Sequence, residues 1–317
     1  MVRVASMAKR IVVTGGTGFI GRGLVAELAG RGDEVTVLSR DPAKASGRLP
    51  SSARVLPYDP YVEGSWFDAL ADTDVLVHLA GEPLGALRWT ETRKRTFERS
   101  RVDTTELLVR ALAKTEPSRR PKAFVSASAV GYYGASLESV DRDETSPPGS
   151  DFLAQLCVRW EAPAAKAREL GVRVVHARIG VVLGEGGGVL EPLVRAFRLG
   201  VGGPVGTGEQ VVSWVHCHDA NALIVRAIDD EGLDGPLNVT APHPVTMNEF
   251  ADQIGKAMGR RAWLRVPAIA VRAVFGEGAE PMLKGQKVLP KQAERMGYEF
   301  RFPRIDAALA DVLGRAS

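Results

Sequence analysis

The amino-acid sequence predicts an α/β fold, a doubly wound parallel sheet with a smaller C-terminal substrate lobe. Two observations lead to this prediction. Short apolar runs that suit strands alternate with helical stretches through the first half of the chain, which is typical of a parallel sheet covered on both faces. Beyond about residue 180, glycine-rich segments at 184–188 and 200–208 and scattered prolines separate short elements. This change of composition indicates a second, smaller lobe.

The first predicted strand and the turn after it are the most informative segment. The apolar run 11–14 leads into Gly15, Gly18 and Gly21, and a helix is expected to follow. Gly15 can adopt a turn that a Cβ would forbid, Gly18 lets the backbone approach a phosphate, and Gly21 allows close helix packing. The helix N-terminus then faces an anion. The expected dinucleotide contacts in this loop are Gly15, Thr17, Gly18, Phe19, Ile20 and Gly21.

A glycine pattern alone also suits a plain strand-to-helix turn, so the second strand matters. The apolar run 34–38 follows at the distance expected for a β-α-β unit of the Rossmann type, and it ends in Ser39 and Arg40. A carboxylate there would accept hydrogen bonds from a ribose and repel a 2′-phosphate, whereas a hydroxyl beside a guanidinium suits a phosphate. We therefore expect NADP(H), with Arg22 and Lys44 as further positive charges. The alternative is that Arg40 is a solvated loop charge.

Further apolar runs at 55–58, 75–79, 123–126 and 172–177 supply the remaining expected strands. We therefore divide the chain into three parts. Residues 1–180 form an NADP(H)-binding Rossmann domain whose core continues in part beyond residue 180. Residues 181–267 form a substrate-binding lobe interleaved with that core, and residues 268–317 form a C-terminal extension.

Composition excludes several classes of partner. The 317 residues carry 41 basic and 38 acidic side chains mixed along the chain, a net charge of +3 with no basic block, so we expect no binding to nucleic acid or acidic membranes. No apolar run approaches the roughly 18 residues needed to span a bilayer, and residues 1–10 lack the apolar centre of a secretory signal. With two cysteines, Cys157 and Cys217, we expect a cytoplasmic protein without disulfides. Residues 216–219 (His-Cys-His-Asp) do not predict a metal site, because neighbours on an extended segment point to opposite sides.

Three motifs in register carry a resemblance: residues 14–21 (TGGTGFIG), 78–81 (HLAG) and 125–134 (VSASAVGYYG). With them the chain resembles the extended short-chain dehydrogenase/reductases. It looks closest to the atypical branch called nucleoside-diphosphate-sugar epimerase-like, some of whose members carry a cell-division-inhibitor label. The closer match rests on residues 79–83 (LAGEP), 88–90 (RWT), 100–102 (SRV), 180–184 (GVVLG) and 285–290 (GQKVLP). The resemblance assigns the C-terminal extension to a small domain of unknown function.

The resemblance implies a nicotinamide cofactor on the N-terminal domain and a small-molecule substrate beneath the C-terminal lobe. A homodimer is one expectation, since many relatives pair through helices that flank the sheet. Glu82 follows the turn where a strand meets the cofactor, so it is either a buried carboxylate with a raised pKa or a loop acid. Arg101 stands where the superfamily usually has an asparagine, and it either binds an anionic group or pairs with an acid. By this resemblance the further cofactor contacts are Leu79, Ala80, Gly81, Glu82, Arg101 and Ser126.

The catalytic pair of the superfamily is missing. Typical members use a Tyr as general acid/base and a Lys four residues later to lower the pKa of that Tyr, but Leu153 and Cys157 occupy these positions here. Ser128 matches the serine that polarises the substrate oxygen. Tyr132 and Tyr133 follow it, and either one replaces the lost acid or both are ordinary aromatic packing. Candidates for the substrate pocket are Arg178, Gln210 and Trp214, with Ser213 and His216 nearby.

Two hypotheses follow. The first is an NADP(H)-dependent oxidoreductase or epimerase-like enzyme, in which Ser128 orients the substrate and the proton comes from Tyr132, Tyr133, Glu82 or water. The alternative is a catalytically degenerate protein that uses NADP(H) occupancy to order a regulatory or scaffold surface. Loss of the Tyr-Lys pair favours the alternative, and retention of Ser128 and of the glycine-rich lobe favours the enzyme.

Overall fold

The computed structural model describes residues 8–85 and 88–314. Its centre is a seven-stranded sheet with the order β3-β2-β1-β4-β5-β7-β11, in which every neighbouring pair is parallel. These strands are β1 (Arg10–Thr14), β2 (Glu34–Ser39), β3 (Arg54–Pro57), β4 (Val75–His78), β5 (Ala123–Ala129), β7 (Arg173–Ile179) and β11 (Gly235–Val239). The doubly wound Rossmann sheet that the sequence predicts is confirmed.

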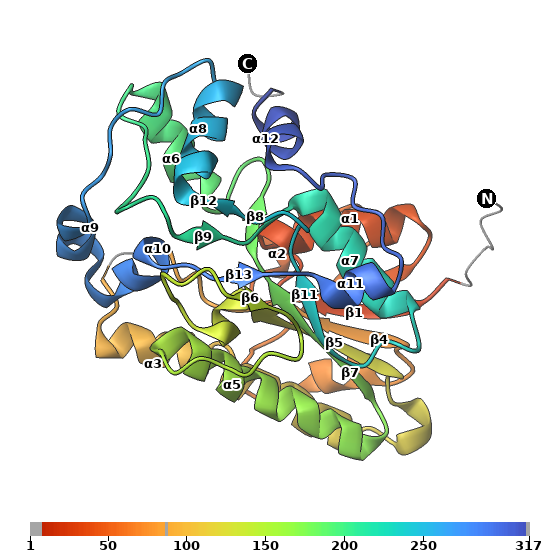
Figure 1. Ribbon diagram of the computed structural model, residues 1–317. Helices are drawn as coiled ribbons and strands as arrows, with labels where there is room; N and C mark the ends of the chain where they lie inside the picture. Colours follow the sequence, from red (N-terminus) through yellow and green to blue (C-terminus); the bar gives the residue numbers. More distant parts are fainter. Residues whose placement is uncertain (1–7, 86–87, 315–317) are drawn as a thin grey trace.

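Helices cover both faces of this sheet (Figure 1). One apolar core joins α1 and α7 to side chains such as Ile11 and Val37, and a second core joins α4 to Val12 and Phe124 on the opposite face. The alternation follows from the pleat, because successive residues of a strand point to opposite faces. The helices are α1 (Phe19–Gly30), α2 (Pro42–Ser46), α3 (Glu91–Arg99), α4 (Val102–Lys114), α5 (Phe152–Ala165), α6 (Leu190–Arg198), α7 (Cys217–Asp229), α8 (Met247–Ala257), α9 (Ala268–Phe275), α10 (Glu280–Leu283), α11 (Lys291–Arg295) and α12 (Ile305–Gly314).

The smaller lobe is built from α6, α8 and α12, which gather at the top of Figure 1 around Trp214 and Phe250. Short strand pairs connect this lobe to the large sheet. They are β8 (Val181–Leu183) with β10 (Trp214–His216), β9 (Val211–Val212) with β12 (Val245–Thr246), and β6 (Asp141–Arg142) with β13 (Lys287–Val288). Because β13 belongs to the C-terminal extension and pairs with β6, the extension returns to the large domain.

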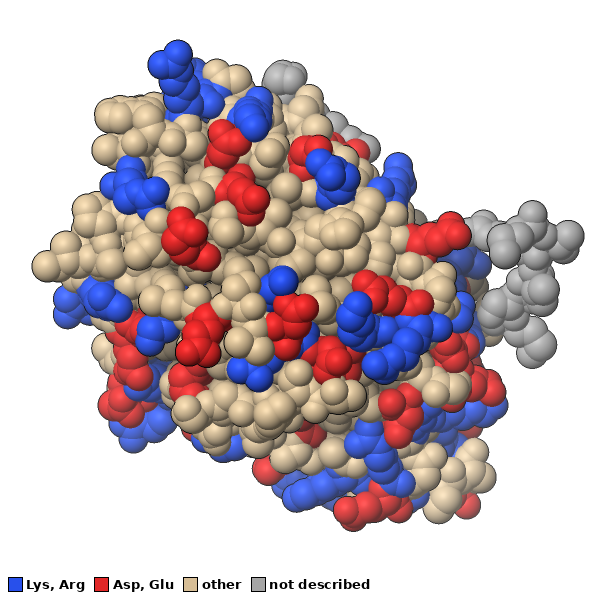
Figure 2. All heavy atoms as spheres, viewed as in Figure 1, with Lys and Arg blue, Asp and Glu red and all other residues tan. Residues whose placement is uncertain are grey.

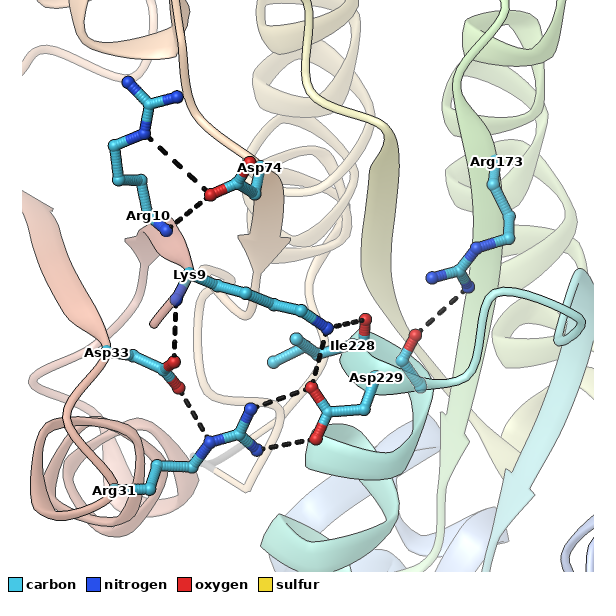
Figure 3. Close-up of polar contacts among 9 residues, drawn as sticks. Lys9, Arg10, Arg31, Asp33, Asp74, Arg173, Ile228 and Asp229 are labelled. Carbon is cyan, nitrogen blue, oxygen red and sulfur yellow. Dashed lines mark hydrogen bonds and ion pairs between the residues drawn. The ribbon is translucent and has the colours of Figure 1, made fainter. Parts of the chain in front are cut away.

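An ionic network lies at the amino end of β1 (Figure 3). Asp229, at the end of α7, accepts from both terminal nitrogens of Arg31, at 2.8 and 2.7 Å, and from Lys9 Nζ at 2.8 Å. The Nε of Arg31 also lies 2.8 Å from the buried carboxylate of Asp33. The network ties the segment after α1 to α7.

The surface carries both signs of charge. Figure 2 shows Lys and Arg interspersed with Asp and Glu over one face, without a block of a single sign. Within the described part of the chain, no helix has the length and apolar character that crossing a membrane requires.

Candidate nucleotide and active site

A cavity of about 630 Å³ lies at the carboxyl ends of β1, β2 and β4. In open α/β sheets, ligands bind in the crevice outside these strand ends. The glycine turn after β1 forms its middle, the end of β2 forms one side and the segment after β4 forms the other. Its lining includes Gly15, Thr17, Gly18, Ser39, Arg40, Lys44, Arg48, Tyr58, Tyr61, Leu79, Ala80, Gly81, Glu82, Ser100 and Thr104.

The glycine turn has the geometry that its spacing predicts. Gly15 has a φ of +71°, and a Cβ there would lie 2.6 Å from the backbone nitrogen of Ala80. A Cβ on Gly21 would lie 2.2 Å from the carbonyl oxygen of Gly15, so both positions require glycine. Gly18 is the N-cap of α1 and offers no side-chain hydrogen bond, which leaves the first N–H groups of this 12-residue helix for a ligand.

Phe19 and Ile20 do not line the cavity. The ring of Phe19 packs against the glycine-rich loop of the smaller lobe, where a Cβ on Gly187 would lie 2.7 Å from it. Ile20 packs against the core between α1 and the sheet. These two side chains fix the helix that carries the turn, and their predicted role in binding the cofactor remains a prediction.

The end of β2 is basic. Arg40, Lys44 and Arg48 all line the cavity beside Ser39, whose hydroxyl bonds to the backbone of Asp41. Asp41 lies there too, but its carboxylate accepts from the N–H of Lys44 and caps α2. The three cations fit a phosphate dianion. The sequence reasoning missed Arg48, four residues after Lys44, and Arg22 does not line the cavity.

The segment after β4 forms the other side. The N–H of Leu79 donates to the carbonyl of Thr14, and the N–H of Glu82 donates to the hydroxyl of Ser100. The side chain of Glu82 is exposed. The burial that we considered for its carboxylate is therefore wrong, because the chain turns outward after Gly81.

Arg101 lies beneath this segment and is 7% exposed. One terminal nitrogen donates to the carbonyl of Glu82 at 3.0 Å, and the other donates to the carbonyl of Phe97 at 3.3 Å. The guanidinium lies 5.0 Å from the ring centroid of Trp160. Burial lowers the pKa of Arg101, while the nearby Cys157 and Glu82 act in the opposite direction. No ion pair holds Arg101 within the described chain.

Ser128 belongs to a buried network with a fixed hydrogen-bond direction. Its hydroxyl donates to Glu161 Oε1 at 2.6 Å, since a carboxylate can only accept. The two oxygens of Glu161 accept from Arg178 Nε and Nη2, each at 2.9 Å. The remaining Arg178 nitrogen donates to the Tyr133 hydroxyl at 3.0 Å, and that hydroxyl donates to Asn238 at 2.7 Å.

Within this network, the polar groups of two predicted site residues, Tyr133 and Arg178, form hydrogen bonds to other side chains of the protein. Burial raises the pKa of Tyr133 to about 12, against the opposing effect of Arg178. Arg178 is 4% exposed, and its guanidinium also lies 3.4 Å from the ring centroid of Tyr132. The structure therefore places Arg178 in an internal ion pair, and Tyr132 is the more accessible of the two tyrosines.

Leu153 and Cys157 lie on α5, at the positions that the Tyr-Lys pair would occupy. The side chain of Leu153 packs beside Gly131, and the Cys157 sulfur lies 3.8 Å from the carbonyl of Ala129. Burial raises the pKa of the Cys157 thiol to about 12. Neither group can exchange a proton readily near neutral pH.

The remaining predicted site residues support the fold. Ser126 is buried in β5 opposite His78 of β4. Gln210 Nε2 donates to the carbonyls of Val205 and Met282, and Trp214 Nε1 donates to the carbonyl of His243. These bonds join parts of the smaller lobe and its extension, so their predicted role in the substrate pocket remains a prediction.

The His-Cys-His-Asp segment also has structural partners. His216 caps α7 by accepting from the N–H of His218. Asp219 accepts from the hydroxyl of Tyr298 and from the N–H groups of Arg301 and Phe302. Among the residues that the structure describes, no group of His, Cys, Asp and Glu could hold a metal ion.

Two family models match the chain. The NAD dependent epimerase/dehydratase family model matches residues 11–239, and a domain of unknown function, DUF1731, matches residues 266–312. Epimerase family protein SDR39U1 of Homo sapiens is 40% identical over 308 residues, which cover 96% of this chain and 99% of that protein. Its chloroplastic homologue in Arabidopsis thaliana is 40% identical over 304 residues, with 96% and 86% coverage. A cytoplasmic location therefore stays a prediction.

Solved structures agree with the fold. The crystal structure of human SDR39U1 (isoform2) with NADPH has a TM-score of 0.82 and 38% identity, covering 96% of this chain and 99% of that one. MoeE5 in complex with UDP-glucose and NAD has a TM-score of 0.78 at 22% identity, with 97% and 98% coverage. At that identity the likeness concerns the fold alone.

Proposed function

Because the chain belongs to the NAD-dependent epimerase/dehydratase family, we propose that it is an NADP(H)-dependent oxidoreductase or epimerase-like enzyme that works without the Tyr-Lys pair. The observation that carries this proposal is the basic end of the cavity. Arg40, Lys44 and Arg48 surround Ser39 at the strand end where a carboxylate would select NAD(H). The similarity to a human relative crystallised with NADPH supports the same cofactor.

The residues present fit a dinucleotide along the whole cavity. The turn of Gly15 and Gly18 and the N-terminus of α1 would hold the pyrophosphate, and the basic end would hold the 2′-phosphate. The segment of Ala80 and Gly81 would lie toward the nicotinamide half. When bound, the nicotinamide supplies hydride transfer, and the protein supplies orientation and charge.

Ser128 has a defined role in this proposal. Its proton is donated to Glu161, so only oxygen lone pairs remain for a ligand. Ser128 can therefore accept a hydrogen bond from a substrate hydroxyl, and it suits an alcohol better than a carbonyl. Arg178 holds Glu161 in place through two hydrogen bonds of 2.9 Å and acts as a positioning residue.

Calorimetry tests the cofactor assignment. NADPH, NADP⁺ and NADH are titrated into the wild type, Arg40→Ala and the matched control Arg22→Ala. We expect Arg40→Ala to weaken NADPH about tenfold or more and NADH little, because only NADPH carries the 2′-phosphate. Arg22 lies outside the cavity lining, so its variant should bind as the wild type does. Equal affinity of wild type and Arg40→Ala for NADPH would refute the assignment.

A second candidate function is a nucleotide-dependent regulatory protein without turnover. Leu153 and Cys157 favour it, because neither supplies the ordinary proton transfer. Absorbance of the nicotinamide, which detects net oxidation, and NMR of the substrate, which detects epimerisation without net reduction of the cofactor, separate the two candidates. The NADP⁺-loaded protein is mixed with UDP-glucose, the ligand of MoeE5, and with other secondary alcohols. Reduced nicotinamide or an epimerised product that is lost in Ser128→Ala supports the enzyme, and nucleotide binding with neither change across the panel supports the regulator.

A further inference from the structure

The structure contains two deeply buried arginines beside the candidate active site, and they differ in one respect. Arg178, 4% exposed, has both oxygens of Glu161 at 2.9 Å. Arg101, 7% exposed, has carbonyl and hydroxyl partners and an aromatic ring but no carboxylate among the described residues. A guanidinium stays charged at any ordinary pH, so burying one without an anion is unfavourable.

The polar atoms around Arg101 are also incompletely satisfied. The Nε of Arg101 and the indole Nε1 of Trp160 are both buried and have no hydrogen-bond partner in the described structure. Buried N–H groups without partners are rare in folded proteins, and each one requires a physical explanation. Here two such donors belong to a stacked pair, with the guanidinium carbon 5.0 Å from the indole centroid.

Arg101 lies directly under the wall of the nucleotide cavity. A Cβ on Gly81 would lie 3.3 Å from the guanidinium carbon, so the charge lies directly against a residue that lines the cavity. Ser100 and Thr104, on either side of Arg101 in sequence, both line the cavity. Arg101 is also the N-cap residue of the 13-residue α4, whose amino end has no side-chain cap.

We propose that Arg101 is the anion-binding residue of the substrate site, so that the substrate carries a carboxylate or phosphate group that binds at the amino end of α4. This inference rests on the proposed function, because it places the substrate beside the β4 end of the nucleotide cavity. The opposing charge would compensate the guanidinium that the fold leaves unpaired. Burial also lowers the pKa of Arg101, which is the direction expected for a cation without a counter-ion.

The test separates the substrate anion from the cofactor phosphates. The protein is first saturated with NADP⁺, which occupies the basic end of the cavity, and is then titrated by calorimetry with malonate and, separately, with inorganic phosphate. We expect at least one of the two anions to bind, and the stronger one identifies the group that the site takes. Failure of NADP⁺ to bind would overturn the proposed function, whereas NADP⁺ binding with no binding of either anion would overturn only the role of Arg101.

Variants assign the binding to the residue. In Arg101→Gln the anion affinity should fall about tenfold or more, since a charge-assisted hydrogen bond is lost. Arg101→Lys keeps a cation and should bind with intermediate affinity. The matched control is Arg110→Gln, which makes the same charge change on an exposed side chain of the same helix. Equal losses in Arg110→Gln and Arg101→Gln would show a nonspecific charge effect and refute the assignment.

A second readout uses NMR to detect the anion at Arg101 directly. In the wild-type protein, the nitrogen NMR signal of the Arg101 Nε–H should shift when the anion is added, because this unpartnered donor gains an acceptor. Arg101→Lys identifies the signal by its loss. An unmoved Arg101 signal at anion saturation would contradict the proposal even if calorimetry detected heat.

Discussion

Replacing Glu161 by Gln keeps the shape of the side chain and removes the charge that holds the buried network together. Arg178 would keep its bond to Tyr133 and its contact with Tyr132, but it would lose the carboxylate charge and at least one of its two bonds of 2.9 Å, because Gln has a single acceptor oxygen. The amide nitrogen of Gln would also face a donor, either Arg178 or Ser128. Removing one partner of a buried ion pair costs about 3–5 kcal/mol, and the remaining contacts of Arg178 place this variant near ~3 kcal/mol.

Denaturant unfolding followed by circular dichroism measures this change, with the m-value checking that both proteins unfold in the same way. A double-mutant cycle sharpens the test. Arg178→Met alone should destabilise by a similar amount, because it leaves the Glu161 carboxylate uncompensated. The double variant should lose far less than the sum of the two single variants, since neither charge remains buried alone. Additive losses, or a loss below about 1 kcal/mol in Glu161→Gln, would refute this account of the network.

Three further predictions concern other parts of the molecule. Burial lowers the pKa of His78 from 6.5 to about 3. Between these two pH values the unfolded chain is protonated at His78 and the folded chain is not. The unfolding free energy should therefore fall between pH 6.5 and 3, by up to about 1.4 kcal/mol per pH unit. His78→Gln should reduce this slope in unfolding curves measured across the same range. Gly15→Ala should destabilise by about 1–3 kcal/mol and abolish nucleotide binding in calorimetry, because its Cβ would overlap the backbone of Ala80. Asp229→Ala should lower the unfolding free energy by about 1 kcal/mol, since its ion pairs with Arg31 and Lys9 are partly solvated; an unchanged denaturation midpoint would contradict this.

The sequence predicts those features that depend on neighbours along the chain. The turn at Gly15 and Gly21 follows from steric limits that act within a few residues, and the structure has that geometry. The six apolar runs chosen as strands all lie in the central sheet. The seventh strand, β11, escaped the sequence reasoning because it begins with Gly235 and Pro236, which argue against a strand. It lies at the edge of the sheet, where a proline is tolerated.

Features that depend on distant partners could not be predicted. Gln210 and Trp214 look like pocket residues in sequence, but their donors are satisfied by carbonyls of Met282 and His243 in other parts of the chain. The sequence assigns no site role to Glu161. Nothing local reveals that it lies between Ser128 and Arg178, because three different elements meet there.

The two buried arginines bear on the question of whether the site has lost its catalytic function. Loss of function alone would relax selection on charge, and a cation left without a partner would then be expected to give way to a neutral residue, because burial disfavours it. Instead, α5, which has Cys157 at the position of the Lys, lies against α4, whose N-cap residue Arg101 brings a cation close to Cys157. Each of these two groups shifts the pKa of the other. Arg101 thus supplies a positive charge beside the position where the resemblance expects a Lys. This placement is easier to reconcile with an anionic ligand than with a nucleotide-binding surface that has no chemistry to perform.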